Sequence, residues 1–128
     1  MRKIVIEMLK IYQPLSNLDW LNYRIVQNSE LTYHHIVKKC DGGKKTVSNG
    51  AILLPTTHQY LHLIEHMDLD TYITINNLFK EVNAQKQEPT MTQRYVLEEI
   101  LEKFEKEHKW DKGNNGEILI KRKYLKRW

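Results

Sequence analysis

Histidines are concentrated in one stretch of the chain, at spacings that suit metal binding. Five of the six histidines lie between residues 34 and 66. His34 and His35 are adjacent in a run rich in β-branched and aromatic residues, and adjacent side chains on a strand point to opposite faces. His58 and His62 are four positions apart, so on a helix both project from the same face. Imidazole binds divalent ions well, so this pattern favours a metal site.

Cysteine does not contribute to such a site. Cys40 is the only cysteine of the chain, which excludes an intramolecular disulfide and a zinc site built from thiolate pairs. Any metal must therefore be held by imidazole, carboxylate, carbonyl or water. Glu65 lies on the same helical face as His58 and His62, where it would either orient a ligand or form a simple salt bridge.

The elements around these histidines follow from local patterns. Residues 31–37 favour a strand, Asp41-Gly42-Gly43 indicates a turn, and residues 51–54 favour a second strand that ends at Pro55. Thr56 or Thr57 would then cap a helix that runs to about Met67. The predicted order is strand, long loop, strand and helix.

The flanking segments are mainly helical in pattern. Residues 3–12 fit a strand or a helix before Pro14, and a short helix capped by Ser16 or Asn17 is expected through Leu18, Trp20, Leu21 and Ile25. Asp68 or Asp70 would cap a further helix with one buried face, formed by Tyr72, Ile75, Leu78, Phe79 and Val82.

Thr90 and Gln93 form a capping-box pattern for the next helix. The side chains expected to face inward from it are Val96, Leu97, Ile100, Leu101 and Phe104. Residues 118–120 fit a last strand before a basic tail.

The histidines belong to a longer motif. The run Tyr33-His34-His35-Ile36 is followed by Gly42-Gly43-Lys44, Asn49-Gly50, Leu54-Pro55, His58 and His62. This motif resembles that of the HNH endonucleases, and most closely the DNase colicin type, which places two adjacent histidines first and two more on the helix. The resemblance covers residues 31–66. The paired Cys-x-x-Cys motifs that many HNH proteins carry are absent, so helices would have to hold the fold.

The resemblance implies a role for each motif residue. His35 would be the general base that takes a proton from the attacking water. His34 and His58 would bind the catalytic metal, with His62 as the third ligand. Asn49 would pin the loop so that His35 points correctly. The implied cofactor is one divalent ion, with magnesium or manganese as the working ion and with zinc or nickel also able to bind.

The predicted fold class is α+β: a central ββα-metal finger at residues 31–66, flanked by N- and C-terminal helices. We expect a single domain over residues 1–128, with C-terminal helices at 68–109 and a basic tail at 117–128. The implied activity is metal-dependent hydrolysis of DNA phosphodiester bonds, leaving 5′-phosphate and 3′-hydroxyl ends.

The charge pattern is compatible with DNA as the partner. The formal net charge is +4, and Lys38, Lys44 and Lys45 flank the motif, where they would bind backbone phosphates or simply keep the loop soluble. The tail at 117–128 would make an auxiliary DNA contact or only solubilise the protein. Trp20, Trp110 and Trp128 fit packing better than base stacking.

Two other functions remain open. In the first, the histidine site only stabilises a non-catalytic DNA- or protein-binding module, although a closed structural site would use four ligands and leave His35 and Asn49 without a role. In the second, RNA is the substrate, although no single-strand stacking module is recognisable. No apolar run approaches the roughly 20 residues of a membrane span, and we expect a cytoplasmic protein.

Overall fold

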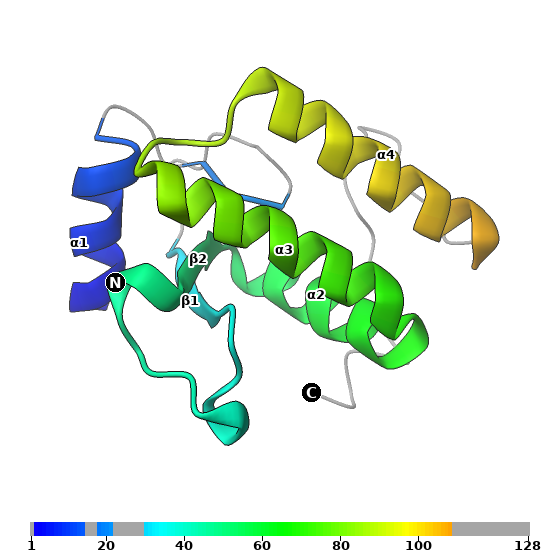
Figure 1. Ribbon diagram of the computed structural model, residues 1–128, viewed down its shortest axis with the longest axis horizontal. Coiled ribbons are helices and arrows are strands. Elements are labelled where there is room, and N and C mark those ends of the chain that lie inside the picture. Colours follow the sequence, from blue (N-terminus) through cyan, green and yellow to red (C-terminus); the bar gives the residue numbers. More distant parts are fainter. Residues whose placement is uncertain (1, 15–17, 22–29, 109–128) are drawn as a thin grey trace.

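The computed structural model describes residues 2–14, 18–21 and 30–108. These ranges form an α+β fold, as predicted, with one two-stranded antiparallel sheet and four α-helices (Figure 1). In chain order the helices and strands are α1 (Lys3–Tyr12), β1 (Thr32–His35), β2 (Gly50–Leu53), α2 (Pro55–Met67), α3 (Leu69–Gln85) and α4 (Met91–Glu107).

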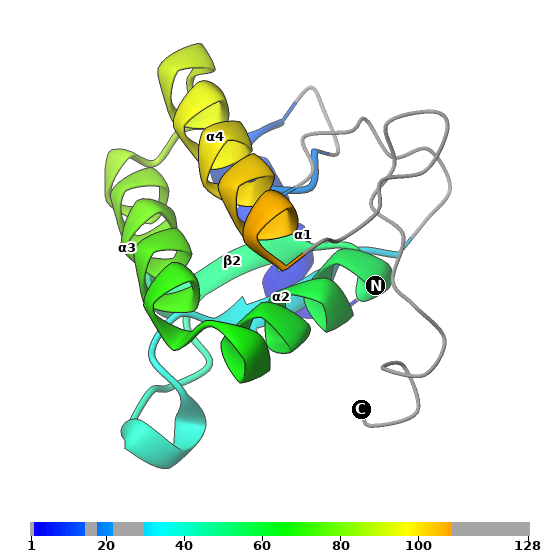
Figure 2. The same cartoon turned by 90° about the vertical axis from the view of Figure 1, so that its right-hand side faces the viewer.

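The two strands are short, and a long segment connects them. Thr32 of β1 lies opposite Leu53 of β2, and His35 lies opposite Gly50. The connecting segment contains two 3-10 turns. The first, Lys39–Asp41, projects away from the helices (Figures 1 and 2), whereas the second, Val47–Asn49, is joined to α3 by a hydrogen bond from Asn83 Nδ2 to the Val47 carbonyl. The predicted order of strand, loop, strand and helix is confirmed, and it places His35 where β1 gives way to the connecting segment.

Helix α2 follows β2 almost directly. Leu54 is its N-cap residue and Pro55 is the first helical residue, where the missing N–H of proline costs nothing. The predicted cap by Thr56 or Thr57 is therefore wrong, because both residues lie inside the first turn. The early start fixes the position of His58 one turn into the helix.

Residues 3–12, which fitted a strand or a helix, form the helix α1. The helix predicted through residues 18–25 is wrong over its described part, residues 18–21. The Trp20 N–H donates to the Ile52 carbonyl at 2.9 Å, and the buried Asp19 carboxylate accepts from the Leu21 and Leu54 N–H groups. These bonds join the segment to β2 and compete with helix formation. Ser16, Asn17 and Ile25 lie outside the described residues.

The predicted caps of the last two helices are confirmed. Asp68 accepts a hydrogen bond from the Thr71 N–H at the start of α3, and Thr90 and Gln93 form a reciprocal capping box at the start of α4. All five predicted α3 residues are buried. On α4 the prediction for Val96 is wrong: it is 42% exposed, because Leu97, Leu101 and Phe104 already fill the narrow stripe that faces the core.

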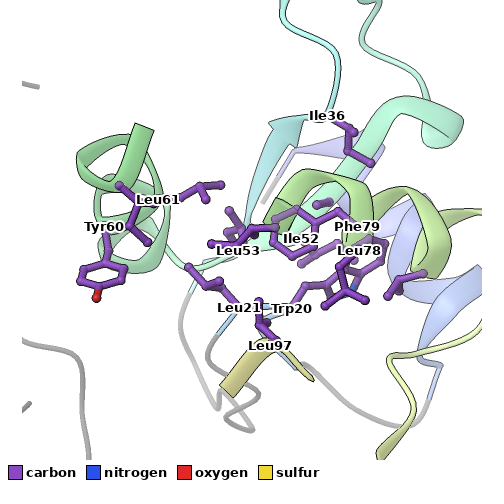
Figure 3. Close-up of a cluster of buried hydrophobic side chains, with 14 of the residues drawn as sticks. Trp20, Leu21, Ile36, Ile52, Leu53, Tyr60, Leu61, Leu78, Phe79 and Leu97 are labelled. Atoms are coloured by element: carbon purple, nitrogen blue, oxygen red, sulfur yellow. The ribbon is translucent and has the colours of Figure 1, made fainter. Parts of the chain in front are cut away.

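The buried side chains form one cluster drawn from the sheet and the helices. Figure 3 shows Ile52 and Leu53 of β2 beside Phe79 of α3, with Trp20 and Leu97 below them. Trp20 is fully buried, which confirms its predicted packing role. Trp110, Trp128, the strand predicted at 118–120 and the tail at 117–128 lie outside the described residues.

Among the described residues, none of the helices combines the length and the apolar character that crossing a membrane requires.

Candidate metal centre and active site

The structure brings together the three histidines predicted as metal ligands. His34 comes from β1, while His58 and His62 lie one turn apart on α2. The ring centroids are 5.3 Å apart for His34 and His58, 6.2 Å for His34 and His62, and 4.8 Å for the stacked pair His58 and His62. One nitrogen from each ring lies within 4.8 Å of the corresponding nitrogens of the other two. This grouping can hold a single ion.

Burial keeps two of these rings neutral. It lowers the pKa of His34 to about 3, an effect that the hydrogen bond to Asn76 opposes and that the neighbouring histidines reinforce. Burial also lowers the pKa of His58 to about 4, with His62 and His35 adding to the effect. Only a neutral imidazole has a lone pair to offer a metal, so both rings are ready to bind an ion at pH 7 without losing a proton.

The ring of His58 is oriented by a hydroxyl from β1. Thr32 Oγ1 lies 3.1 Å from His58 Nδ1, and the same hydroxyl donates to the Leu53 carbonyl at 2.8 Å. Since the hydroxyl proton goes to Leu53, Thr32 acts as an acceptor toward His58. The proton of His58 is then on Nδ1 and its lone pair on Nε2. Thr32 lies on the same face of β1 as His34, two residues away, a placement that strand alternation could have predicted.

The ring of His62 has a carboxylate partner. Its Nδ1 lies 3.3 Å from Glu65 Oε1, which can only accept, so the lone pair of neutral His62 is on Nε2. Glu65 also forms an ion pair with Lys38. The salt bridge predicted as one alternative for Glu65 is therefore present, and the contact with His62 is the one that the other alternative, orientation of a metal ligand, would require. Carboxylates that hold metal-binding histidines in this way raise the basicity of the ligand.

The donor set fits a divalent transition ion. Three neutral imidazoles from two elements, with a hydroxyl and a carboxylate behind two of them, match the ligands that zinc and nickel prefer. Three protein ligands are one fewer than the four of a closed structural zinc site, which leaves a position for water or substrate.

His35 lies on the other face of β1. Its ring packs edge-on against Tyr33 with the centroids 4.9 Å apart, and it is partly exposed. Desolvation lowers its pKa, and the charges of Lys45 and Lys39 lower it further. His35 is close enough to the other rings for its charge to lower the pKa of both His34 and His58. A neutral, partly exposed imidazole of this kind can accept a proton near neutral pH.

Asn49 ties the connecting segment to the end of β1. Its Oδ1 accepts from the Val37 N–H at 2.8 Å, and its Nδ2 donates to the carbonyls of Val37 and Lys44, both at 3.0 Å. The Asn49 carbonyl accepts from the Ile36 N–H at 2.9 Å. These contacts begin at the residue after His35, so the amide fixes the backbone that carries that ring.

The hydrogen bonds between Asn49 and Val37 also explain why glycine is needed at position 43. A Cβ atom there would lie 1.8 Å from the Val37 carbonyl oxygen and 2.9 Å from Asn49 Nδ2. The backbone at Val37 cannot retreat without breaking its bonds to Asn49, so any side chain would open the loop.

The three lysines predicted to bind phosphate have different surroundings. Lys38 is paired with Glu65, and its Nζ lies 5.8 Å from the centre of the Tyr72 ring. Lys44 and Lys45 are exposed, and Lys45 Nζ lies 5.9 Å from the centre of the Tyr33 ring, on the His35 side of β1. Lys38 and Lys45 thus lie on opposite sides of β1.

A cleft of about 350 Å³ opens beside the ligand cluster. Three residues that contact the rings of the candidate ligands, Glu65, Tyr72 and Asn76, line it together with Lys38 and other residues of α3 and the loop after β1. His35 is not among the lining residues. Sequence reasoning missed Asn76 and Tyr72, because both lie on a helix beyond the motif and nothing in their local pattern distinguishes them.

No family model, curated protein or solved structure matches this chain.

Proposed function

We propose that the protein is a metal-dependent endonuclease of the HNH type that hydrolyses DNA phosphodiester bonds. The observation that carries the proposal is the gathering of His34, His58 and His62, with one nitrogen from each within 4.8 Å of the others. Support also comes from His35, which directly follows a ligand on β1 and whose backbone is tied down by Asn49. Ligands, base and anchoring amide are the elements that the HNH motif requires.

In this proposal, His35 accepts a proton from a water molecule whose oxygen attacks the phosphorus. The P–O3′ bond breaks and the leaving oxygen takes up a proton, which gives the 5′-phosphate and 3′-hydroxyl ends. A bound divalent ion supplies charge neutralisation at the phosphate and the leaving oxygen. The lowered pKa of His35 keeps the ring unprotonated at neutral pH, as a general base must be.

The side chains available for the DNA backbone are Lys44 and Lys45, both exposed, of which Lys45 lies close to His35. Each cation that neutralises a phosphate releases a counterion, so binding should weaken as salt rises. Lys38 forms an ion pair with Glu65, the carboxylate that contacts His62, so we assign Lys38 to the metal centre rather than to the substrate.

The chemistry of the ligands bears on the choice of ion. A three-imidazole site should bind nickel or zinc more tightly than magnesium, which prefers oxygen ligands. Magnesium or manganese can still be the working ion at the concentrations found in cells.

The experiment is plasmid cleavage by protein stripped of metal, with magnesium, manganese, nickel or zinc added back singly. We expect no cleavage with chelator present and restored cleavage with at least one ion. Cleavage that survives complete metal removal contradicts the proposal.

A second candidate function is a non-catalytic DNA- or protein-binding module stabilised by the metal. It is favoured by one observation: the ligand His34 points into the interior toward α2 and α3, whereas His35 packs on Tyr33 on the opposite face. The His35→Ala variant discriminates between the two. Loss of cleavage in this variant with metal binding intact supports the nuclease. A wild-type protein that binds metal but cleaves DNA with none of the four ions supports the module.

A further inference from the structure

One face of helix α3, which lies beyond the motif of residues 31–66, packs against His34, the most buried of the three candidate ligands. Tyr72, Asn76 and Phe79 of α3 all contact His34: the two aromatic ring centroids lie 6.3 Å and 6.0 Å from that of His34, and Asn76 Oδ1 lies 2.8 Å from His34 Nε2. These three residues are spaced by four and three positions, so they share one helix face. His34 is only 2% exposed, and α3 supplies much of its enclosure.

The contact with Asn76 determines which nitrogen of His34 can bind a metal. The amide oxygen of asparagine only accepts hydrogen bonds, so Nε2 of neutral His34 must carry the proton. The lone pair is then on Nδ1. His58 and His62 have the opposite arrangement, because their Nδ1 atoms contact Thr32 and Glu65 and their lone pairs are on Nε2.

We propose that Asn76 is a positioning residue of the metal centre, which holds His34 with Nδ1 toward the ion while His58 and His62 present Nε2. The inference rests on the metal site of the proposed function and extends it to α3. Asn76 is itself buried, at 6% exposure, so water has little access to the bond between its amide and His34 and would not readily replace the amide if it were removed. Without it, the His34 ring keeps its place in the core but not a fixed orientation.

The test compares Asn76→Leu, which has similar size and no acceptor, with Asn76→Asp, which keeps an acceptor oxygen. Asn77→Leu is the matched control, since Asn77 is the exposed neighbour on the same helix. Zinc affinity is measured by calorimetry, and the cobalt-substituted proteins are compared by their visible absorption spectra. Unfolding of the metal-free proteins in urea reports any general loss of stability.

We expect Asn76→Leu to weaken zinc binding by about 10- to 100-fold, the usual effect of removing a partner of a metal-binding histidine. Its cobalt spectrum should differ from that of the wild type, while Asn76→Asp should keep the wild-type spectrum and bind zinc within a few-fold of the wild type. Asn77→Leu should match the wild type in both measurements. If Asn76→Leu does not fold, Asn76→Ser replaces it, because its hydroxyl is too short to reach Nε2.

Wild-type affinity and spectrum in the variant without an acceptor would overturn the role of Asn76 and leave the metal site standing. Equal weakening in Asn76→Leu and Asn76→Asp would also overturn it, because only packing would then be lost. A wild-type protein that binds no zinc would overturn the metal centre itself, and with it the proposed function.

Discussion

The two faces of β1 carry the same kind of side chain in two different environments. On the inner face, His34 is buried against α3 and its neighbour Thr32 bonds to His58. On the outer face, His35 is partly exposed and packs against Tyr33, near the charge of Lys45. Strand alternation alone separates the two rings. One backbone step thus places two imidazoles on opposite faces, one among the candidate metal ligands and the other in the position proposed for the general base.

Removal of the outer ring, His35, should have the largest effect on activity. The His35→Ala variant should lose about 100- to 10,000-fold in cleavage rate, the usual contribution of a general base. Its zinc affinity should stay within about twofold of the wild type, because none of the three ligands bonds to His35. Plasmid cleavage and calorimetry on the same preparation check both. A parallel loss of metal affinity would show that the two faces are not independent.

Lowering the pH should destabilise the metal-free protein through the two buried rings, His34 and His58. The folded pKa values of His34 and His58, about 3 and about 4, lie below the ordinary value of 6.5. As the pH falls through 6.5 the unfolded chain takes up protons first, so the free energy of unfolding of the metal-free protein should fall between about pH 6.5 and pH 4. The loss is at most about 1.4 kcal/mol per pH unit for each group.

Urea unfolding at several pH values measures this loss, and a His58→Gln variant should show a shallower dependence on pH. A free energy of unfolding that stays constant between pH 6.5 and pH 4 would mean that these rings are not buried in neutral form.

Removal of the Asn49 amide, which fixes the backbone after His35, should have a smaller effect. The Asn49→Ala variant loses three side-chain hydrogen bonds to Val37 and Lys44, at a cost of about 1–3 kcal/mol in the free energy of unfolding. Cleavage should fall because the backbone after His35 is no longer fixed, while zinc affinity should hold. Unfolding, cleavage and calorimetry test this together. Normal cleavage by a measurably destabilised variant would exclude a role for Asn49 in placing the base.

The smallest effect concerns the charge beside His35. Lys45 lowers the pKa of His35, so Lys45→Gln should raise it. The acidic limb of the pH–rate profile for cleavage should then move to higher pH. Lys44→Gln is the matched control and should not move it, because Lys44 is not among the charges that shift His35. Equal shifts in both variants would point to a general effect of charge on DNA binding.

The ligand set could be predicted from the sequence because it depends on regular local geometry. His58 and His62 share a helix face at any place in the fold, and His34 and His35 must point to opposite sides of a strand. Asn76 could not be found in this way. It lies 42 residues from His34, and their contact depends on how α3 packs over the sheet.

In the fold, too, local contacts could be predicted from the sequence and distant ones could not. The capping box of Thr90 and Gln93 was predictable because it joins residues three apart. The segment at residues 18–21 was predicted as a helix from its apolar spacing, but Asp19 and Trp20 bond to residues more than thirty positions away on and beside β2. Such distant partners outweigh weak local preferences, and no local pattern encodes them.

In the proposed site, three imidazoles of this chain hold one divalent ion while a fourth, His35, stays outside the ligand set. Zinc titration of the metal-stripped wild type, His58→Ala, His35→Ala and His66→Ala proteins measures this arrangement. We expect one ion per chain, at least about 100-fold weaker binding in His58→Ala, and unchanged binding in His35→Ala and in the exposed control His66→Ala. No binding by the wild type, or equal weakening in His35→Ala and His58→Ala, would contradict it.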